Sequence, residues 1–192
     1  MTELWLVRHG QTDWNVTGRY QGQRDIPLNA EGLAQAAALA AGLDGQRFAA
    51  IYSSDLMRAR QTADALSAHT GLPVQLDARL REIHQGEWEG QYIREVVAVN
   101  PRARHDALVD PSQARAPGGE SVLQVLERVS AAADEIAARH SGKRVLVVSH
   151  GLALATLIVQ TAGAEITGLY GLIPDNAVPT VVHWPPIRRM VG

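Results

Sequence analysis

Short apolar runs alternate along the chain with longer stretches in which apolar residues recur every three or four positions. The runs "LWLV" and "VLVV" contain no polar residue at all, as is typical of strands that are covered on both faces of a mostly parallel sheet. Runs of this kind predict five strands, at residues 3–7, 48–52, 74–76, 144–149 and about 177–183.

Helical periodicity fills the segments between these runs. Asn29 is suited to cap a helix from about Ala30 to Leu43. Asp55 is suited to cap a second helix, which ends near Gly71. The alternation of strands and helices predicts one α/β domain over residues 1–192, a three-layer α/β/α sandwich with a mostly parallel central sheet. Further helices are expected at residues 91–99, 120–142 and 151 to about 162, with an irregular loop at 100–119.

Composition narrows the class of protein. The chain has 192 residues, of which 46% are hydrophobic, enough for the core of one sizeable domain. A net charge of −2 gives no reason to expect nucleic acid as a partner, and no apolar run approaches the ~20 residues that span a bilayer. Cysteine is absent, which excludes disulfides and cysteine nucleophiles. We therefore expect a cytoplasmic protein without a membrane partner.

Two of the predicted strands end in a His-Gly pair. Arg8, His9 and Gly10 follow the first strand, and His150 and Gly151 follow the strand at 144–149. The carboxyl ends of parallel strands line one crevice, where ligands of such sheets bind. Glycine after each histidine lets the backbone turn and lets a ligand approach closely. One pair alone is more often structural, but two pairs with an adjacent arginine favour a shared site.

Two further segments add charged side chains of the kind that handle phosphate. Arg58 follows the strand at 48–52, and Glu82 lies in the Gly- and Trp-containing segment 79–90. Arginines and a protonated histidine neutralise phosphoryl oxygens, a neutral histidine can attack phosphorus, and a carboxylic acid can protonate the leaving oxygen. All but one of the 18 basic residues are arginine, so composition explains most of them, and we interpret Arg60 as a solvated surface residue.

Together these motifs resemble the histidine phosphatase superfamily. Within it, the chain is most similar to the branch of cofactor-dependent phosphoglycerate mutases and small broad-specificity phosphatases. The resemblance extends over residues 3–151, in the family's order, and rests on "LVRHGQTDWN" with its RHG motif, "GRYQGQRDIPLNAEG", "SSDLMRARQTA", "LREIHQGEWEG", "PGGES" and "VLVVSHG".

The resemblance implies a catalytic role for each of these residues. His9 would be the nucleophile and become a phosphohistidine, and Glu82 would donate a proton and then act as the base. Arg8, Arg58 and His150 would bind the transferring phosphoryl group of a small phosphorylated metabolite. No cofactor or metal is needed. His9 must start unprotonated and Glu82 protonated. The phosphate pocket would be lined by Asn15, Gln21, Gly22 and Gly151.

The acceptor of the phosphoryl group decides between two activities: water gives a phosphatase, and a phosphoglycerate hydroxyl gives a mutase. Gln85 and Ile93 stand where we would align the tyrosine and lysine of the mutases, and Lys143 is the only lysine in the chain. This favours the phosphatase, with the mutase as the alternative. Three loop arginines are candidates for recognising an acidic substrate, although solvation explains them better: Arg102, Arg104 and Arg115.

Two other classes of function remain open from the residues alone. The side chains of His9, His84, His150 and Glu82 are of types that bind zinc or manganese, although nearby arginines would repel a metal. Sensitivity to chelators separates this alternative from a metal-free phosphatase. The chain also fits a non-catalytic phosphate binder. A homodimer is possible, with the tail from His183 packing on a partner.

Overall fold

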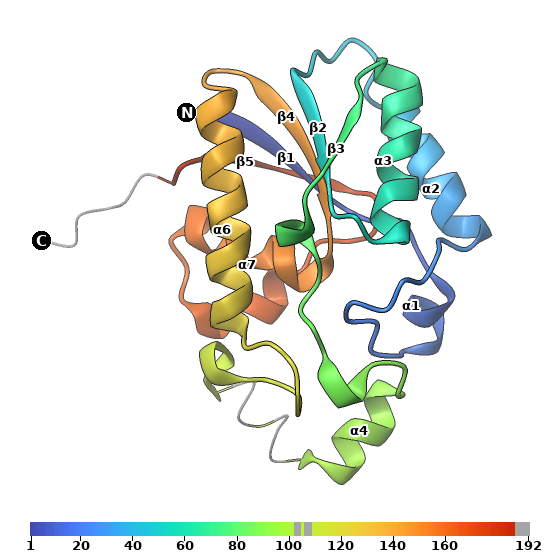
Figure 1. Cartoon of the computed structure of the whole chain (residues 1–192), viewed down its shortest axis with the longest axis vertical. Coiled ribbons are helices and arrows are strands. Elements are labelled where there is room, and N and C mark those ends of the chain that lie inside the picture. The colour runs from blue at the N-terminus through green and yellow to red at the C-terminus, as the bar shows by residue number, and fades with distance from the viewer. Residues whose placement is uncertain (102–104, 106–108, 187–192) are drawn as a thin grey trace, which may run out of the picture.

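The computed structural model describes residues 1–101, 105 and 109–186. The strands are β1 (Thr2–Arg8), β2 (Ala50–Ser53), β3 (Val74–Leu76), β4 (Arg144–Ser149) and β5 (Pro179–Trp184). They form one five-stranded sheet in the order β3-β2-β4-β1-β5 (Figure 1). Neighbouring strands run parallel except β5, which pairs antiparallel with β1. The predicted mostly parallel sheet is therefore confirmed.

The α-helices are α1 (Asp13–Thr17), α2 (Ala30–Ala41), α3 (Met57–Thr70), α4 (Ile93–Val99), α6 (Val122–Arg139) and α7 (Gly151–Ala162). The sheet lies between two helical layers, α2 and α3 on one face and α6 and α7 on the other (Figure 1). No described helix is both long and apolar enough to cross a membrane. Short 3-10 helices complete the fold: η1 (Ala78–Leu80), η2 (Gly86–Trp88), η3 (Pro111–Gln113) and η4 (Ile166–Leu172).

Alternate residues of the central strands enter two separate cores. Leu4, Leu6 and Val145 pack on the side of α6 and α7, whereas Val7 and Leu146 pack on the side of α2 and α3. Successive side chains of a strand point to opposite faces. A strand between two helical layers therefore needs apolar residues at nearly every position, each contributing about 2 kcal/mol when buried. This explains the unbroken apolar runs of β1 and β4.

One predicted helix cap is wrong. Asn29 caps α2 as expected, since its side chain accepts from the N–H of Gly32 at 2.9 Å. Asp55 does not cap α3, because its carboxylate receives two hydrogen bonds from Arg81 instead. The N–H of Met57 donates to Asp25 at 2.6 Å, so a residue from a distant loop satisfies the start of α3. Local sequence patterns do not contain this contact.

Candidate active site

The register of the two central strands brings the two histidines together. Arg8 pairs with Ser149 across β1 and β4, so His9 and His150 leave the sheet side by side. Their ring centroids are 5.2 Å apart, at an interplanar angle of 60°. Both residues are buried, with exposed fractions of 3% and 0%. The predicted meeting of the two strand ends is thus present in the structure.

His9 is held as a neutral imidazole with a defined tautomer. Its Nδ1 lies 2.7 Å from the carbonyl oxygen of Gly10, which only accepts, so Nδ1 carries the proton. Its Nε2 then carries the lone pair and accepts from Nε of Arg58 at 3.2 Å. Desolvation, followed by the charge of Arg58, holds the pKa of His9 well below its ordinary value. Nε2 is therefore the ring nitrogen that carries a lone pair.

Arg58 is a buried cation fixed at all three of its nitrogens. Besides Nε, its Nη1 donates to the carbonyl of Arg24 and its Nη2 to the carbonyl of Gly22, both at 2.8 Å. Desolvation lowers the pKa of Arg58 to about 10, an effect opposed by nearby carboxylates such as Glu82, so the guanidinium stays charged at neutral pH. Arg60, two residues on, is exposed as expected.

Two buried nitrogens beside His9 lack a partner among the described residues. They are Nε of Arg8 and Nδ1 of His150. Nη1 of Arg8 donates to the carbonyl of Pro174 at 3.0 Å, and Nε2 of His150 lies 2.8 Å from Oγ of Ser54. Buried polar atoms in native proteins nearly always have a partner. Nε of Arg8 is thus available to an oxygen of a phosphoryl group, and so is Nδ1 of His150 in the tautomer whose Nε2 accepts from the hydroxyl of Ser54.

The histidine pair is electrostatically matched to an anion. Desolvation holds the pKa of His150 well below its ordinary value, and the charge of Arg58 lowers it further. Desolvation also lowers the pKa of Arg8, against the attraction of Glu82 and Asp175. With both imidazoles neutral, the positive charge of the site resides on the two guanidinium groups, where it can balance phosphoryl oxygens.

Glu82 lies close enough to Arg8 and Arg58 for its charge to oppose the lowering of their pKa values. Its Oε1 accepts from the N–H of Ile83 at 2.9 Å and of Ala153 at 3.2 Å. Its Oε2 accepts from the N–H of Leu152 at 3.2 Å. The carboxylate therefore occupies the N-terminus of α7, the helix that begins directly after His150, where backbone N–H groups favour an anion.

The four residues predicted to line the phosphate pocket differ in their surroundings. Gly22 has a left-handed backbone (φ +52°), and a Cβ there would lie 2.1 Å from Oε1 of Glu89, so glycine is required. A Cβ at Gly151 would lie 3.5 Å from Cζ of Arg8. Gln21 has a buried Oε1 without a partner among the described residues. Asn15 belongs to the capping box of α1, whose N-cap is Thr12, since its Oδ1 accepts from N–H and Oγ1 of Thr12, both at 3.0 Å.

Sequence reasoning missed two residues that hold the histidines. Asn176, just before β5, donates from Nδ2 to the carbonyl of His9 at 2.7 Å. Its neighbours offer no local signal, because the contact depends on β5 returning beside β1. Ser54, which contacts His150, follows β2 at the same sheet edge as the histidines. That position was a signal available in the sequence.

A cavity of about 240 Å³ adjoins the acid side of the site. Ile83 and Leu152, whose N–H groups hold the carboxylate of Glu82, form part of its wall. The catalytic histidines do not line it. The rest of the wall is mainly apolar and aromatic, and includes Tyr20, Trp88, Ile93, Val96 and Tyr170. Among the described residues, Arg115 is the one cationic side chain in this wall.

The remaining candidates lie outside this constellation. His84 points to Glu89, with 3.7 Å between Nε2 and Oε1. Arg102 and Arg104 lie outside the described residues. Among the residues that are described, no group of three or more His, Cys, Asp or Glu side chains is arranged to hold a metal ion.

Comparisons with known proteins agree on one family. The model of the histidine phosphatase superfamily (branch 1) matches residues 4–190. The metal-independent phosphoserine phosphatase of Arabidopsis thaliana is 39% identical over 186 residues, 95% of this chain and 76% of that protein. A probable phosphoglycerate mutase of Escherichia coli is 37% identical over 163 residues, 85% of this chain and 76% of that protein. The solved structure of mycobacterial glucosyl-3-phosphoglycerate phosphatase with VO3 has a TM-score of 0.85 and 36% identity, covering 93% of this chain and 91% of that one.

Proposed function

This chain belongs to branch 1 of the histidine phosphatase superfamily and is a phosphatase of small phosphorylated metabolites, and on that premise we propose that His9 is its nucleophile. The observation that carries the proposal is the neutral Nε2 of His9 between the guanidinium of Arg58 and the available donors of Arg8 and His150. A nucleophile and its anion-binding groups are thus already in place, as phosphoryl transfer requires.

In the first step, the Nε2–P bond forms while the bond from phosphorus to the leaving oxygen breaks. Arg58 transfers its Nε hydrogen bond from His9 to a phosphoryl oxygen, and Arg8 and His150 donate to the others. Glu82, whose backbone partners favour the carboxylate, has to take up a proton before this step and then gives it to the leaving oxygen. In the second step, Glu82 takes a proton from water, the water oxygen bonds to phosphorus, and the Nε2–P bond breaks. Asn15, Gln21, Gly22 and Gly151 shape the pocket around the phosphoryl group.

The mutase is the second candidate, since one of the similar proteins carries that name. The two phosphatases among the similar proteins favour hydrolysis, as does the lack of a lysine at the position of Ile93. Isomerisation of 3-phosphoglycerate in the presence of a bisphosphate primer, without release of inorganic phosphate, would identify a mutase instead.

The direct test combines product release with trapping of the intermediate. Release of phosphate from phosphoserine and from an aryl phosphate is measured in the presence of a chelator, and radiolabelled substrate is quenched in alkali, where phosphohistidine survives. We expect release and a labelled protein for the wild type and neither for His9→Ala, with a loss of at least about 10⁴-fold. The matched control His183→Ala removes an exposed histidine of β5 and should leave both signals unchanged.

We further propose that the alcohol part of the substrate enters the cavity beside Glu82 and carries a carboxylate that Arg115 binds. The leaving oxygen has to face Glu82, and the space beyond it is this cavity, because the two share Ile83 and Leu152. Phosphoserine and glucosyl-3-phosphoglycerate, which the named relatives hydrolyse, both carry a carboxylate.

Replacing Arg115 tests the substrate class. Arg115→Gln should lower kcat/KM for phosphoserine and 3-phosphoglycerate about tenfold, because a hydrogen bond between charged groups is lost. Glycerol phosphate, which has no carboxylate, should be unaffected. Arg94→Gln changes an exposed arginine of α4 outside the cavity and serves as the control. An equal loss for acidic and neutral esters would contradict the assignment of Arg115.

We also propose that the enzyme is cytoplasmic and that it forms a homodimer. The absence of cysteine fits a reducing compartment, which supports a cytoplasmic enzyme. A homodimer is compatible with the exposed apolar residues Val178 and Val181 at the edge of the sheet. Cell fractionation and light scattering during size exclusion test the two proposals, and a monomeric mass at all concentrations would exclude the dimer.

A further inference from the structure

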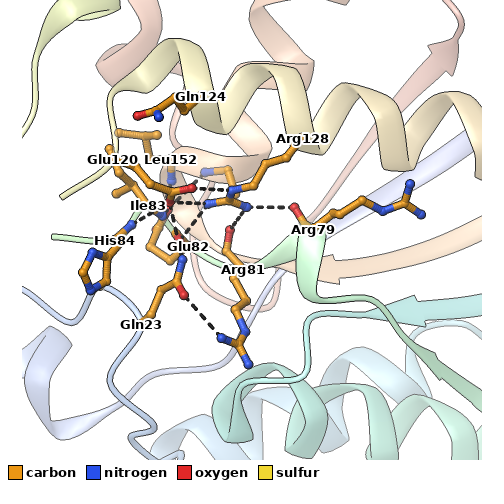
Figure 2. Close-up of polar contacts among 12 residues, drawn as sticks. Gln23, Arg79, Arg81, Glu82, Ile83, His84, Glu120, Gln124, Arg128 and Leu152 are labelled. Carbon is orange, nitrogen blue, oxygen red and sulfur yellow. Dashed lines mark hydrogen bonds and ion pairs between the residues drawn. The ribbon is translucent and has the colours of Figure 1, made fainter. Parts of the chain in front are cut away.

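The backbone that carries Glu82 is held mainly by one side chain from another layer of the fold, and Gln23 donates a further hydrogen bond from Nε2 to the carbonyl of Glu82 at 3.1 Å. Arg128 of α6 donates from Nη1 to the carbonyls of Arg79 at 2.8 Å and Arg81 at 2.6 Å, and from Nη2 to the carbonyl of Glu82 at 2.9 Å. Figure 2 shows its guanidinium between α6 and this segment. The backbone carbonyls of Arg79, Arg81 and Glu82 thus all accept from one planar guanidinium group.

Glu120 completes the attachment from the other side. It accepts from Arg128 through both carboxylate oxygens, at 2.9 Å to Nε and 2.8 Å to Nη2. Its Oε2 also accepts from the N–H of His84 at 2.8 Å (Figure 2). Desolvation would raise the pKa of Glu120, but the hydrogen bonds from Arg128 and His84 bring it below its ordinary value, so its carboxylate stays ionised at neutral pH.

The pair is anchored in a rigid element. Val125 and Val129, on either side of Arg128 along α6, are fully buried against the core. The side chains of Arg128 and Glu120 are 18% and 23% exposed, so solvent competes little for their hydrogen bonds. A partly buried, bidentate pair of this kind is more directional than an ion pair on the surface. Neither residue contacts His9, His150 or Arg58 in any hydrogen bond described above.

We propose that Arg128 and Glu120 are positioning residues for the proton transfer by Glu82. They fix the backbone at 79–82 and at 84, so the carboxylate between these points meets both the N–H groups of α7 and the leaving oxygen. The inference rests on the acid role proposed for Glu82. It assigns the pair to the half-reaction in which the leaving group needs a proton, and not to the binding of phosphate.

The dependence of the rate on the leaving group tests this assignment. Aryl and alkyl phosphates with leaving groups of graded basicity are compared, because a leaving group that is stable as an anion needs no acid. Arg128→Met should lower kcat/KM for alkyl phosphates about 10²-fold, as expected for a small misplacement of a catalytic group, and leave kcat/KM for nitrophenyl phosphate near wild type. The comparison uses kcat/KM because it reports the steps up to departure of the leaving group, whereas kcat also contains the attack of water, in which Glu82 is the base for every substrate. Glu120→Gln should show the same pattern more weakly.

Three controls separate this role from general destabilisation. Arg139→Met removes an exposed arginine of the same helix, paired with Glu135, and should leave every substrate unchanged. Arg128→Lys keeps the charge but cannot serve three carbonyls and a carboxylate, so it should recover only part of the rate. Thermal unfolding of each variant shows whether it is folded at the assay temperature. If Arg128→Met does not fold, Glu120→Gln carries the test.

The outcomes distinguish the positioning role from the acid role itself. An equal loss for all leaving groups, or no loss for any, overturns the inference. A leaving-group effect in Glu82→Gln that is absent from both Arg128→Met and Glu120→Gln also overturns it and leaves the acid role intact. If Glu82→Gln itself shows no leaving-group effect, the acid role fails, and the inference fails with it.

Discussion

The nucleophile side and the acid side of the site are built in different ways. His9 and His150 follow two strands paired residue by residue, so the hydrogen bonds of the sheet set their separation. Glu82 lies between the turns η1 and η2 and depends on side chains of distant elements, above all Arg128. The proposed nucleophile side is thus positioned by backbone register, and the proposed acid side by side-chain hydrogen bonds.

Because of this difference, we expect only some substitutions to affect one substrate more than another. A change on the nucleophile side acts on the phosphoryl group, which is common to every substrate. A change on the acid side acts on the leaving group and on the cavity beyond it, which differ between substrates. Rates measured with a single aryl phosphate would therefore underestimate the acid side. The dependence of the rate on the leaving group and on pH therefore tests the difference between the nucleophile side and the acid side.

The largest effect is expected for Arg58→Lys. Lysine cannot reproduce the fork that donates to His9, Gly22 and Arg24, and phosphoryl transfer loses its buried cation. We expect kcat/KM to fall about 10³-fold for aryl and alkyl phosphates alike. Arg60→Lys, two residues further along α3 and exposed, is the matched control. A loss confined to alkyl phosphates would place Arg58 on the acid side and break the comparison.

A smaller and selective effect is expected for Glu82→Gln. The amide cannot supply a proton, so kcat/KM for alkyl phosphates should fall by about 10²-fold or more, whereas kcat/KM for nitrophenyl phosphate should fall far less. Glu87→Gln changes an exposed carboxylate in η2 and provides the control. Equal losses for both substrates would mean that Glu82 acts on the phosphoryl group itself.

The smallest effect concerns stability and pH. The pKa values of His9 and His150 in the folded protein lie well below the ordinary 6.5, chiefly because of desolvation. Below pH 6.5 the unfolded chain therefore binds protons that the folded protein does not, and the free energy of unfolding should fall by up to about 1.4 kcal/mol per pH unit for each histidine. Above pH 6.5 this contribution is fully present and constant.

Urea denaturation between pH 7.5 and 5.5 measures this slope. His9→Ala should reduce it by the share of one histidine, and His183→Ala should not change it. An unchanged slope in His9→Ala would mean that His9 is protonated in the folded protein, and the neutral nucleophile would have to be abandoned.

The sequence predicts the two sides unequally well. Arg8, His9 and His150 could be placed because strand periodicity ends where they begin, and parallel strands share an edge. The site of Glu82 followed from the family resemblance, since its segment has no periodicity that would place it. Arg128, Asn176 and the cap from Asp25 were not predicted, because each acts on a residue far away in the chain. The wrong cap at Asp55 has the same cause, since Arg81 competes for its carboxylate.

The strand order also determines at what point during synthesis of the chain the site can form. His9 leaves the ribosome well before β4 and Asn176, the elements that hold it. Because chains are made from the N-terminus onwards, the nascent polypeptide carries the imidazole of His9 throughout the synthesis of the residues in between, without the neighbours that desolvate it. A product that is terminated before β4 is therefore expected to have no activity towards phosphate esters.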